Sequence, residues 1–180
     1  MKGNNQIIEN LNLLLADELS AVNQYMVQSE MCQNWGYQRL HEAIKKQALD
    51  EMKHAEKLIE RILFLEGMPL VGNLNKIRIG KDITEQFNND CASETDAIKV
   101  YNSAIKLAEE LGDHGTAELL HSILLDEEKH LDWLETQTQQ IKHTINRHLF
   151  HEERMGYGDD KNHLTTDGFC FLIRSVLKCS

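Results

Sequence analysis

The 180-residue chain is poor in proline, which occurs once, at Pro69, and it contains no long apolar run. Ten glycines and 41% hydrophobic residues exclude collagen-like and low-complexity classes and favour a folded, helix-rich domain. No segment approaches the roughly 18 to 20 apolar residues that span a bilayer, and the N-terminus lacks the basic and apolar parts of a signal peptide. We therefore expect a cytoplasmic protein without a membrane partner.

Cysteine and basic residues are also scarce. The four cysteines show no CxxC spacing, which argues against a zinc ribbon or a dense disulfide framework and favours reduced thiols. The 19 basic residues are outnumbered by 29 acidic ones, so the formal net charge is −10. This balance argues against nucleic acid or anionic lipid as a partner and makes small cations the natural ligands.

Apolar residues recur at helical spacing along most of the chain, which predicts an all-α fold. The first two helices are expected over residues 5–34 and 39–66, with a short turn at Gly36 between them. Residues 67–82 contain three glycines and Pro69 and show no helical stripe. This segment is therefore predicted to be a long connection.

The second half of the chain repeats the helical pattern. A third helix is expected from Asp82 or Thr84, either of which could cap it, to Gly112, and a fourth from about residue 115 to 143. A basic stretch at 142–154 is expected to form a short fifth helix. Two short turns and one long middle connection predict a four-helix bundle with a crossover between helices two and three.

Two segments carry Glu-x-x-His on a predicted helix: Glu51 with His54, and Glu127 with His130. Three positions is nearly one helical turn, so each Glu shares a face with its His. One such pair is weak evidence, because it occurs by chance on many solvated helices. Gly36 and Gly112, the two turn glycines, are separated by the same interval as the two pairs, which indicates a tandem repeat of a helical hairpin.

This hairpin repeat extends to the first helix of each hairpin, where Glu18 and Glu94 are separated by the same interval again. Glu18 precedes Gly36 and Glu51 follows it at a similar separation along the chain. The two separations differ by about three positions, so at about 1.5 Å rise per residue the two glutamates differ in height by only roughly 5 Å. Six side chains are therefore expected to converge near the middle of the bundle: Glu18, Glu51, His54, Glu94, Glu127 and His130.

Four carboxylates in the centre of a bundle repel one another and lose hydration, at several kcal/mol per ion. Two divalent cations would balance their charge, and two neutral imidazoles would complete the coordination. Oxygen-rich ligation with one His per metal suits iron or manganese better than zinc, and it is the ligand set of di-iron and di-manganese bundles. The competing interpretation, surface Glu–His pairs on salt-bridged helices, is disfavoured by the matched spacing. The other seven histidines show no partner pattern and are expected to be exposed or hydrogen-bonded.

Over residues 1–155 the chain resembles bacterioferritin, the haem-containing branch of the ferritin family. The resemblance rests on several segments, among them Met1-Lys2-Gly3, Asn34-Trp35-Gly36, Asp50-Glu51-Met52-Lys53-His54-Ala55 and His130-Leu131-Asp132-Trp133-Leu134-Glu135. It implies that the six converging residues form a ferroxidase centre, with Glu51 and Glu127 bridging two Fe per subunit and one His on each iron. It also implies a hollow cage of twenty-four subunits that stores ferric mineral.

The resemblance further implies haem b, shared between two subunits, with Met52 of each as axial ligand of the haem iron. One residue beyond Glu51, Met52 is rotated by about 100° away from the metal centre. Some family members have a His one turn before Asp50, where this chain has Lys46, so we expect no auxiliary iron site at Asp50. The implied partners are further copies in a homomeric cage, a second bacterioferritin subunit in a mixed cage, and an iron-releasing ferredoxin.

The activity that follows is iron storage and detoxification, in which Fe(II) is oxidised by dioxygen or peroxide. Two other functions stay open: a di-iron or di-manganese peroxidase or catalase without a cage, and a co-assembling haem subunit without ferroxidase activity. Tyr25, one to two turns from Glu18, is either a redox or hydrogen-bonding residue of the centre or a core residue.

The last segment follows no family pattern. We expect a ferritin-like di-iron domain over residues 1–155. Chains of the family usually end near residue 155 to 160, so residues 156–180 are an extension of unknown role. Residues 168–178 carry the stripe of a short amphipathic helix. This helix is predicted to dock on the cage or to bind a partner.

Overall fold

The computed structural model describes residues 1–154, and these form four α-helices without a strand. The extension over 156–180, including the helix expected at 168–178, lies outside the described residues. The all-α prediction is confirmed, and the helix bounds agree with the sequence to within a few residues, except at the end of the fourth helix. The helices are α1 (Asn5–Asn34), α2 (Gln38–Phe64), α3 (Ile83–Glu110) and α4 (His114–Arg154).

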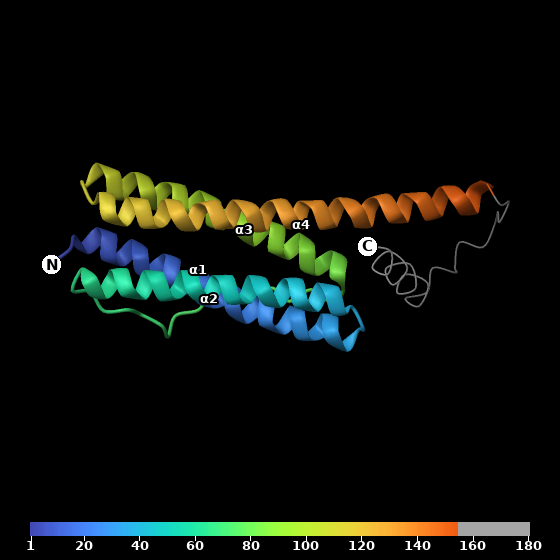
Figure 1. Ribbon diagram of the computed structural model, residues 1–180, viewed down its shortest axis with the longest axis horizontal. Helices are drawn as coiled ribbons and strands as arrows, with labels where there is room; N and C mark the ends of the chain where they lie inside the picture. Colours follow the sequence, from blue (N-terminus) through green and yellow to red (C-terminus); the bar gives the residue numbers. More distant parts are fainter. Residues whose placement is uncertain (155–180) are drawn as a thin grey trace.

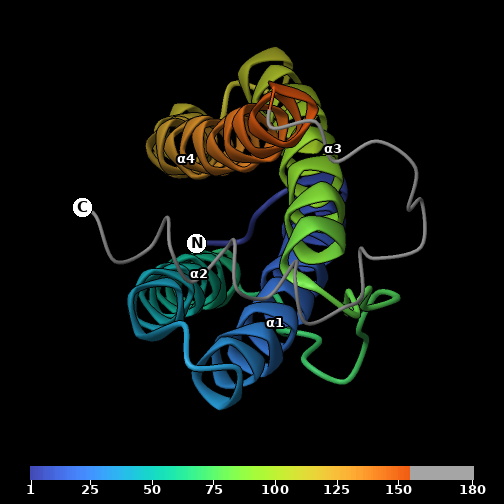
Figure 2. The same cartoon turned by 90° about the vertical axis from the view of Figure 1, so that its right-hand side faces the viewer.

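The helices form two antiparallel hairpins that pack face to face (Figure 1 and Figure 2). In each hairpin the two helices make an extensive interface, α1 with α2 and α3 with α4, while smaller interfaces join α1 to α3 and α2 to α4. The crossover between α2 and α3 runs the length of the bundle, so α3 starts at the end where α1 stops (Figure 1). Neighbouring helices are consequently antiparallel throughout.

The two hairpin turns share one geometry. Gly36 and Gly112 have φ angles of 84° and 72°, in the left-handed region that glycine adopts without a steric penalty. In each turn the amide after the glycine donates to the carbonyl five residues earlier at 2.8 Å, Tyr37 to Cys32 and Asp113 to Ala108. The sequence repeat therefore corresponds to two turns of the same structure. Equivalent residues of the two hairpins consequently lie at the same distance from their turns.

The ends of the second hairpin refine the sequence-based bounds. Asp82, and not Thr84, is the N-cap of α3, because its carboxylate accepts a hydrogen bond of 2.9 Å from the Glu85 amide. The separate fifth helix expected at 142–154 is not found, since α4 continues without a break to Arg154. Residues 116–154 contain neither Gly nor Pro, so nothing in the sequence stops the helix at the predicted boundary.

The crossover has no regular structure and is fixed by side chains of α1. Polar side chains that follow one another along α1 accept hydrogen bonds from crossover amides at 2.7–3.0 Å, Asn12 from Leu70, Ser20 from Asn75 and Gln24 from Arg78. The crossover therefore runs alongside α1 and in the same direction as that helix.

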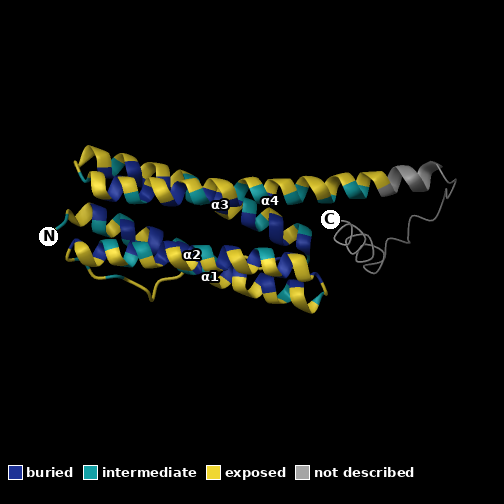
Figure 3. Ribbon diagram, in the orientation of Figure 1, coloured by how far each residue is buried: buried dark blue, intermediate teal, exposed yellow. Residues whose placement is uncertain are grey.

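The buried residues of the helices face the interior of the bundle (Figure 3). The apolar ones form two clusters, one around the first half of α1 and one around its second half. Leu14, Leu58 and Ile123 are among the buried residues of the first cluster, and Ile44 and Phe87 are among those of the second. Between them lies a polar layer of buried carboxylates and imidazoles. None of the described helices has an apolar stretch long enough to cross a bilayer.

Candidate metal centre

All six residues predicted to converge lie together in the polar layer, and every helix contributes at least one. Glu18 comes from α1 and Glu94 from α3, while α2 and α4 each supply one Glu-x-x-His pair. The most exposed of the six, His130, retains 8% of its accessible surface. The repeat in the sequence therefore places four carboxylates and two imidazoles in one buried cluster: Glu18, Glu51, His54, Glu94, Glu127 and His130.

His54 turns its Nδ1 toward the carboxylates. This atom lies 3.0 Å from Glu51 Oε2, 3.0 Å from Glu127 Oε1 and 3.4 Å from Glu18 Oε2. The other ring nitrogen, Nε2, faces outward and lies 3.5 Å from Asp126 Oδ2. An outer carboxylate on the second nitrogen is the usual device that fixes the orientation and tautomer of a metal-binding histidine.

His130 repeats this orientation on the other side of the cluster. Its Nδ1 lies 2.9 Å from Glu51 Oε1 and 3.8 Å from Glu127 Oε2, and the two imidazole rings are 6.0 Å apart between centroids. Each of the two carboxylates, Glu51 and Glu127, thus directs one oxygen toward His54 and the other toward His130. This is the arrangement that two bridging carboxylates between two cations require.

The six residues divide into two overlapping groups whose donor atoms lie within 4.8 Å of one another. The first group is Glu18, Glu51, His54 and Glu127, and the second is Glu51, Glu94, Glu127 and His130. Several buried atoms of these residues lack a hydrogen-bond partner among the described residues: Glu18 Oε2, Glu51 Oε1, Glu127 Oε1 and His130 Nδ1. Burying polar atoms without partners costs folding free energy. Two cations bound by these oxygen and nitrogen atoms would supply the missing partners.

The electrostatics of the cluster lead to the same conclusion. Burial alone would lower the pKa of both imidazoles, but the carboxylates close to each ring outweigh it and raise the pKa of His54 to about 12 and that of His130 to about 9. Burial raises the pKa of Glu18 and Glu94 well above the ordinary value. The cluster thus binds positive charge strongly, as protons or as metal ions.

Two buried tyrosines contact the cluster from opposite sides. The Tyr25 phenol donates a hydrogen bond to Glu94 Oε1, and the Tyr101 phenol donates one to Glu18 Oε1. Burial and then the neighbouring carboxylates raise the pKa of both phenols well above 10, so each phenol keeps its proton. Tyr25, which the sequence left open, is therefore both a core residue and a hydrogen-bond donor to the centre. Tyr101 was not predicted.

A further buried carboxylate lies one turn before Glu94. Asp90 Oδ1 accepts hydrogen bonds from Gln24 Nε2 at 2.8 Å and Gln28 Nε2 at 2.9 Å, whereas Oδ2 has no partner among the described residues. Burial outweighs these hydrogen bonds and raises the pKa of Asp90 to about 7. This carboxylate belongs to neither of the two donor groups.

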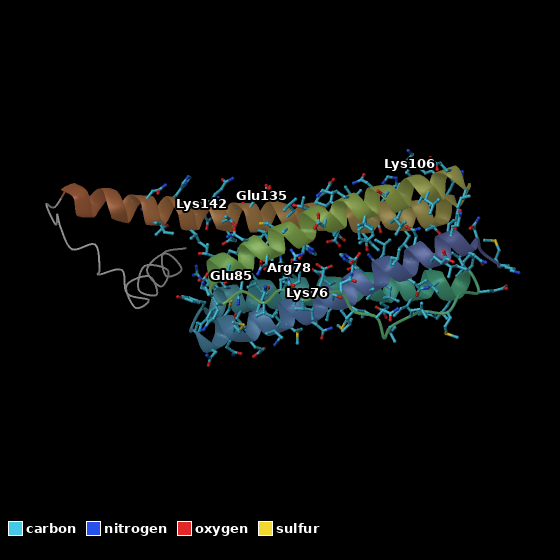
Figure 4. The ribbon with its side chains drawn as sticks, turned by 180° about the vertical axis from the view of Figure 1, so that it is seen from behind. Lys76, Arg78, Glu85, Lys106, Glu135 and Lys142 are labelled. Carbon is cyan, nitrogen blue, oxygen red and sulfur yellow. The ribbon has the colours of Figure 1, made fainter. Side chains whose placement is uncertain are left out.

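A cavity of about 200 Å³ reaches the centre between α1, α3 and the crossover. Four of the six clustered residues line this cavity, Glu18, Glu51, Glu94 and Glu127. Asp17 and Asp96 also line it, and Lys76 and Arg78 line it from the crossover beside the two helices (Figure 4). The carboxylates of the centre can therefore be reached without opening the bundle.

Comparison with known proteins agrees with this geometry. Residues 8–144 match the model of the ferritin family, described as a ferritin-like domain. The chain is 42% identical over 139 residues to a bacterioferritin of Mycolicibacterium paratuberculosis, covering 77% of this chain and 87% of that protein. A bacterioferritin of Brucella melitensis is 41% identical over 137 residues, covering 76% of this chain and 85% of that protein. The chain belongs to the bacterioferritin branch of the ferritin family.

The structure also shows where Met52, Asp50 and His41 lie relative to the centre. Met52 is 52% exposed, so it points away from the buried centre as its position after Glu51 predicted. Lys46 and Lys53 form ion pairs with Asp50 at 3.2 and 2.8 Å, which occupies this carboxylate at the surface. Of the other histidines, His41 is buried and hydrogen-bonded to Ser29, as expected for a residue outside the centre.

Proposed function

We propose that this bacterioferritin stores and detoxifies iron, and that its six-residue cluster is a ferroxidase centre that oxidises Fe(II). The observation that carries this proposal is the sharing of Glu51 and Glu127 between the two donor groups. Two divalent ions in these positions would carry a charge of +4 against four carboxylates, so the buried charge would be neutral with both imidazoles uncharged. Zinc sites with this many carboxylates are unusual, whereas iron and manganese suit oxygen-rich ligation.

In this proposal Fe(II) is the substrate, and the protein contributes binding and charge. Glu18 and His54 hold one ion, Glu94 and His130 hold the other, and Glu51 and Glu127 each contact both. Each Fe(II) loses one electron, and the pair reduces dioxygen with two protons to hydrogen peroxide, or hydrogen peroxide with two protons to two waters. The cavity between α1, α3 and the crossover would let the ions reach the centre.

The haem assignment belongs to the same proposal. A methionine that is 52% exposed on α2 cannot ligate a haem within one chain's core, but it fits an axial ligand shared across a subunit pair. Leu49, 44% exposed one turn away, adds apolar surface beside Met52. Haem b held between the Met52 side chains of two subunits would supply one-electron transfer.

The oligomeric assignment is a cage of twenty-four copies, alone or mixed with a second bacterioferritin subunit, with the domain spanning residues 1–155. Large apolar side chains are exposed on α1 and α2, and self-assembly would remove part of this apolar surface from water. They include Leu13, Met26, Val27, Leu63 and Phe64. A ferredoxin that reduces the stored iron is the further partner we propose.

The test is aerobic addition of Fe(II) to the intact particle. We expect rapid formation of Fe(III), and we expect the iron to elute with protein of a size that fits twenty-four subunits. A small particle that consumes hydrogen peroxide without retaining iron would indicate the peroxidase or catalase function instead. A large particle that binds haem and oxidises Fe(II) no faster than buffer would indicate a co-assembling haem subunit.

A further inference from the structure

Tyr101 occupies the position that the hairpin repeat assigns to Tyr25. The two tyrosines are separated by the same interval as Glu18 and Glu94, and as the two Glu-x-x-His pairs. The repeat therefore includes an aromatic hydroxyl as well as the metal-binding side chains. The phenol of each tyrosine contacts the centre, as the repeat requires.

Each phenol donates its hydrogen bond to a glutamate of the other hairpin. Tyr25 lies on α1 and donates to Glu94 on α3, while Tyr101 lies on α3 and donates to Glu18 on α1. Each hydroxyl thus holds the glutamate that the first helix of the other hairpin supplies. Glu18 and Glu94 are also the two carboxylates that each belong to only one donor group.

We propose that Tyr101 is a positioning residue for one of the two metal positions, the one formed by Glu18, Glu51, His54 and Glu127. Its phenol holds Glu18 Oε1, which leaves Oε2 directed at His54 Nδ1, 3.4 Å away. Glu18 Oε2 has no hydrogen-bond partner among the described residues and is free to bind a cation. The inference rests on the proposed function, because it assigns a role within that centre.

A role confined to core packing does not account for the hydroxyl. The Tyr101 side chain is fully buried and belongs to the apolar cluster with Leu14, Leu58 and Ile105. A phenylalanine would fill the same volume without placing a polar group in that cluster. A glutamate side chain has three rotatable bonds, and a hydrogen bond that fixes its carboxylate in the binding orientation removes an ordering cost from metal binding.

The experiment is Co²⁺ titration of the metal-free protein, followed by calorimetry, because Co²⁺ binds such donors and is not oxidised by air on the timescale of a titration. Wild type is titrated first, and two Co²⁺ per chain are expected from the proposed function. Tyr101→Phe should weaken one of the two sites about tenfold and leave the other unchanged, as outer-sphere substitutions at metal sites do. Tyr25→Phe is the matched variant for the other site.

Double variants identify which site Tyr101 serves. In a Glu18→Gln background, Tyr101→Phe should have no additional effect on Co²⁺ affinity, since the group it positions is already altered. In a Glu94→Gln background it should weaken the remaining site about tenfold. A Tyr101→Phe protein that binds both Co²⁺ ions as wild type does, or that loses the same affinity in both backgrounds, would overturn the inference.

The outcomes separate the inference from the function on which it rests. Wild-type protein that binds fewer than two Co²⁺ per chain would contradict the proposed centre itself. Circular dichroism and thermal unfolding of the metal-free variants check folding, and Tyr101→Met provides a second, smaller variant without the hydroxyl. A loss of thermal stability with unchanged Co²⁺ affinities in either variant would assign Tyr101 to packing alone.

Discussion

Metal binding to the centre should release protons, and the two imidazoles set the smallest number expected. In metal-free protein the carboxylates hold the pKa of His54 at about 12 and that of His130 at about 9, so both imidazoles are protonated at neutral pH. Burial raises the pKa of Glu18 and Glu94 well above the ordinary value, so these carboxyls hold a proton more tightly than a free glutamate does. Metal ligation requires all four groups in their unprotonated forms.

Loading two divalent ions should therefore release at least about two protons per chain at neutral pH, one from each imidazole. The sign follows from the raised pKa of the two imidazoles, because each of them carries a proton in the metal-free protein and the metal competes with that proton. The apparent affinity should fall as pH falls, since protons and metal ions occupy the same donors. These protons belong to the cluster as a whole, because its groups titrate together.

The assay is calorimetric titration with Co²⁺ in two buffers that differ in ionisation enthalpy. The dependence of the observed heat on that enthalpy gives the protons released, and Co²⁺ avoids protons from oxidation or mineral formation. Glu94→Gln removes one carboxylate that can hold a proton, so this variant should release no more protons than the wild type with the same method. Release of fewer than about one proton by the wild type would refute the account of the charges in the centre.

Three substitutions test other parts of the account. Glu127→Ala removes a carboxylate shared by both donor groups and should slow Fe(II) oxidation at least about 100-fold in stopped-flow measurements while circular dichroism stays unchanged; a wild-type rate would contradict the ligand assignment. Met52→Leu keeps size and hydrophobicity but removes the thioether, so the haem absorbance should disappear while Fe(II) oxidation continues, and retained haem would place the ligand elsewhere. The pKa of Asp90 is raised from 3.8 to about 7, so in wild type the stability linked to its proton is lost as pH rises between these values. Asp90→Asn should raise the unfolding free energy of the metal-free protein by about 2 kcal/mol more near pH 8.5 than near pH 5.5, and equal effects at both pH values would contradict the burial argument.

Most of the fold and the centre could be predicted from the sequence because both depend on periodicity. The spacing of apolar residues predicted the positions of the helices. Gly36 and Gly112 mark the two turns, and both have positive φ angles in the structure. The hairpin repeat places Glu18 and Glu94 in the same layer as the Glu-x-x-His pairs. A repeat fixes relative height in a bundle, and relative height decides which side chains meet.

The features that the sequence analysis missed depend on contacts between distant segments. The path of the crossover is set by Asn12, Ser20 and Gln24 on α1, polar residues whose role has no sequence signature. Asp126 looks like a solvated helix residue until His54 Nε2 is placed 3.5 Å from it. Tyr101 could have been found, because the same interval that related the glutamates relates it to Tyr25.

The central claim is that two metal ions bind in each chain and share Glu51 and Glu127. Anomalous diffraction at the iron edge, from crystals soaked anaerobically in Fe(II), locates such ions directly. The account predicts two peaks per chain in the polar layer, about 4 Å apart or less, one beside His54 and one beside His130. A single peak, or peaks that lie outside the layer enclosed by Glu51 and Glu127, would contradict it.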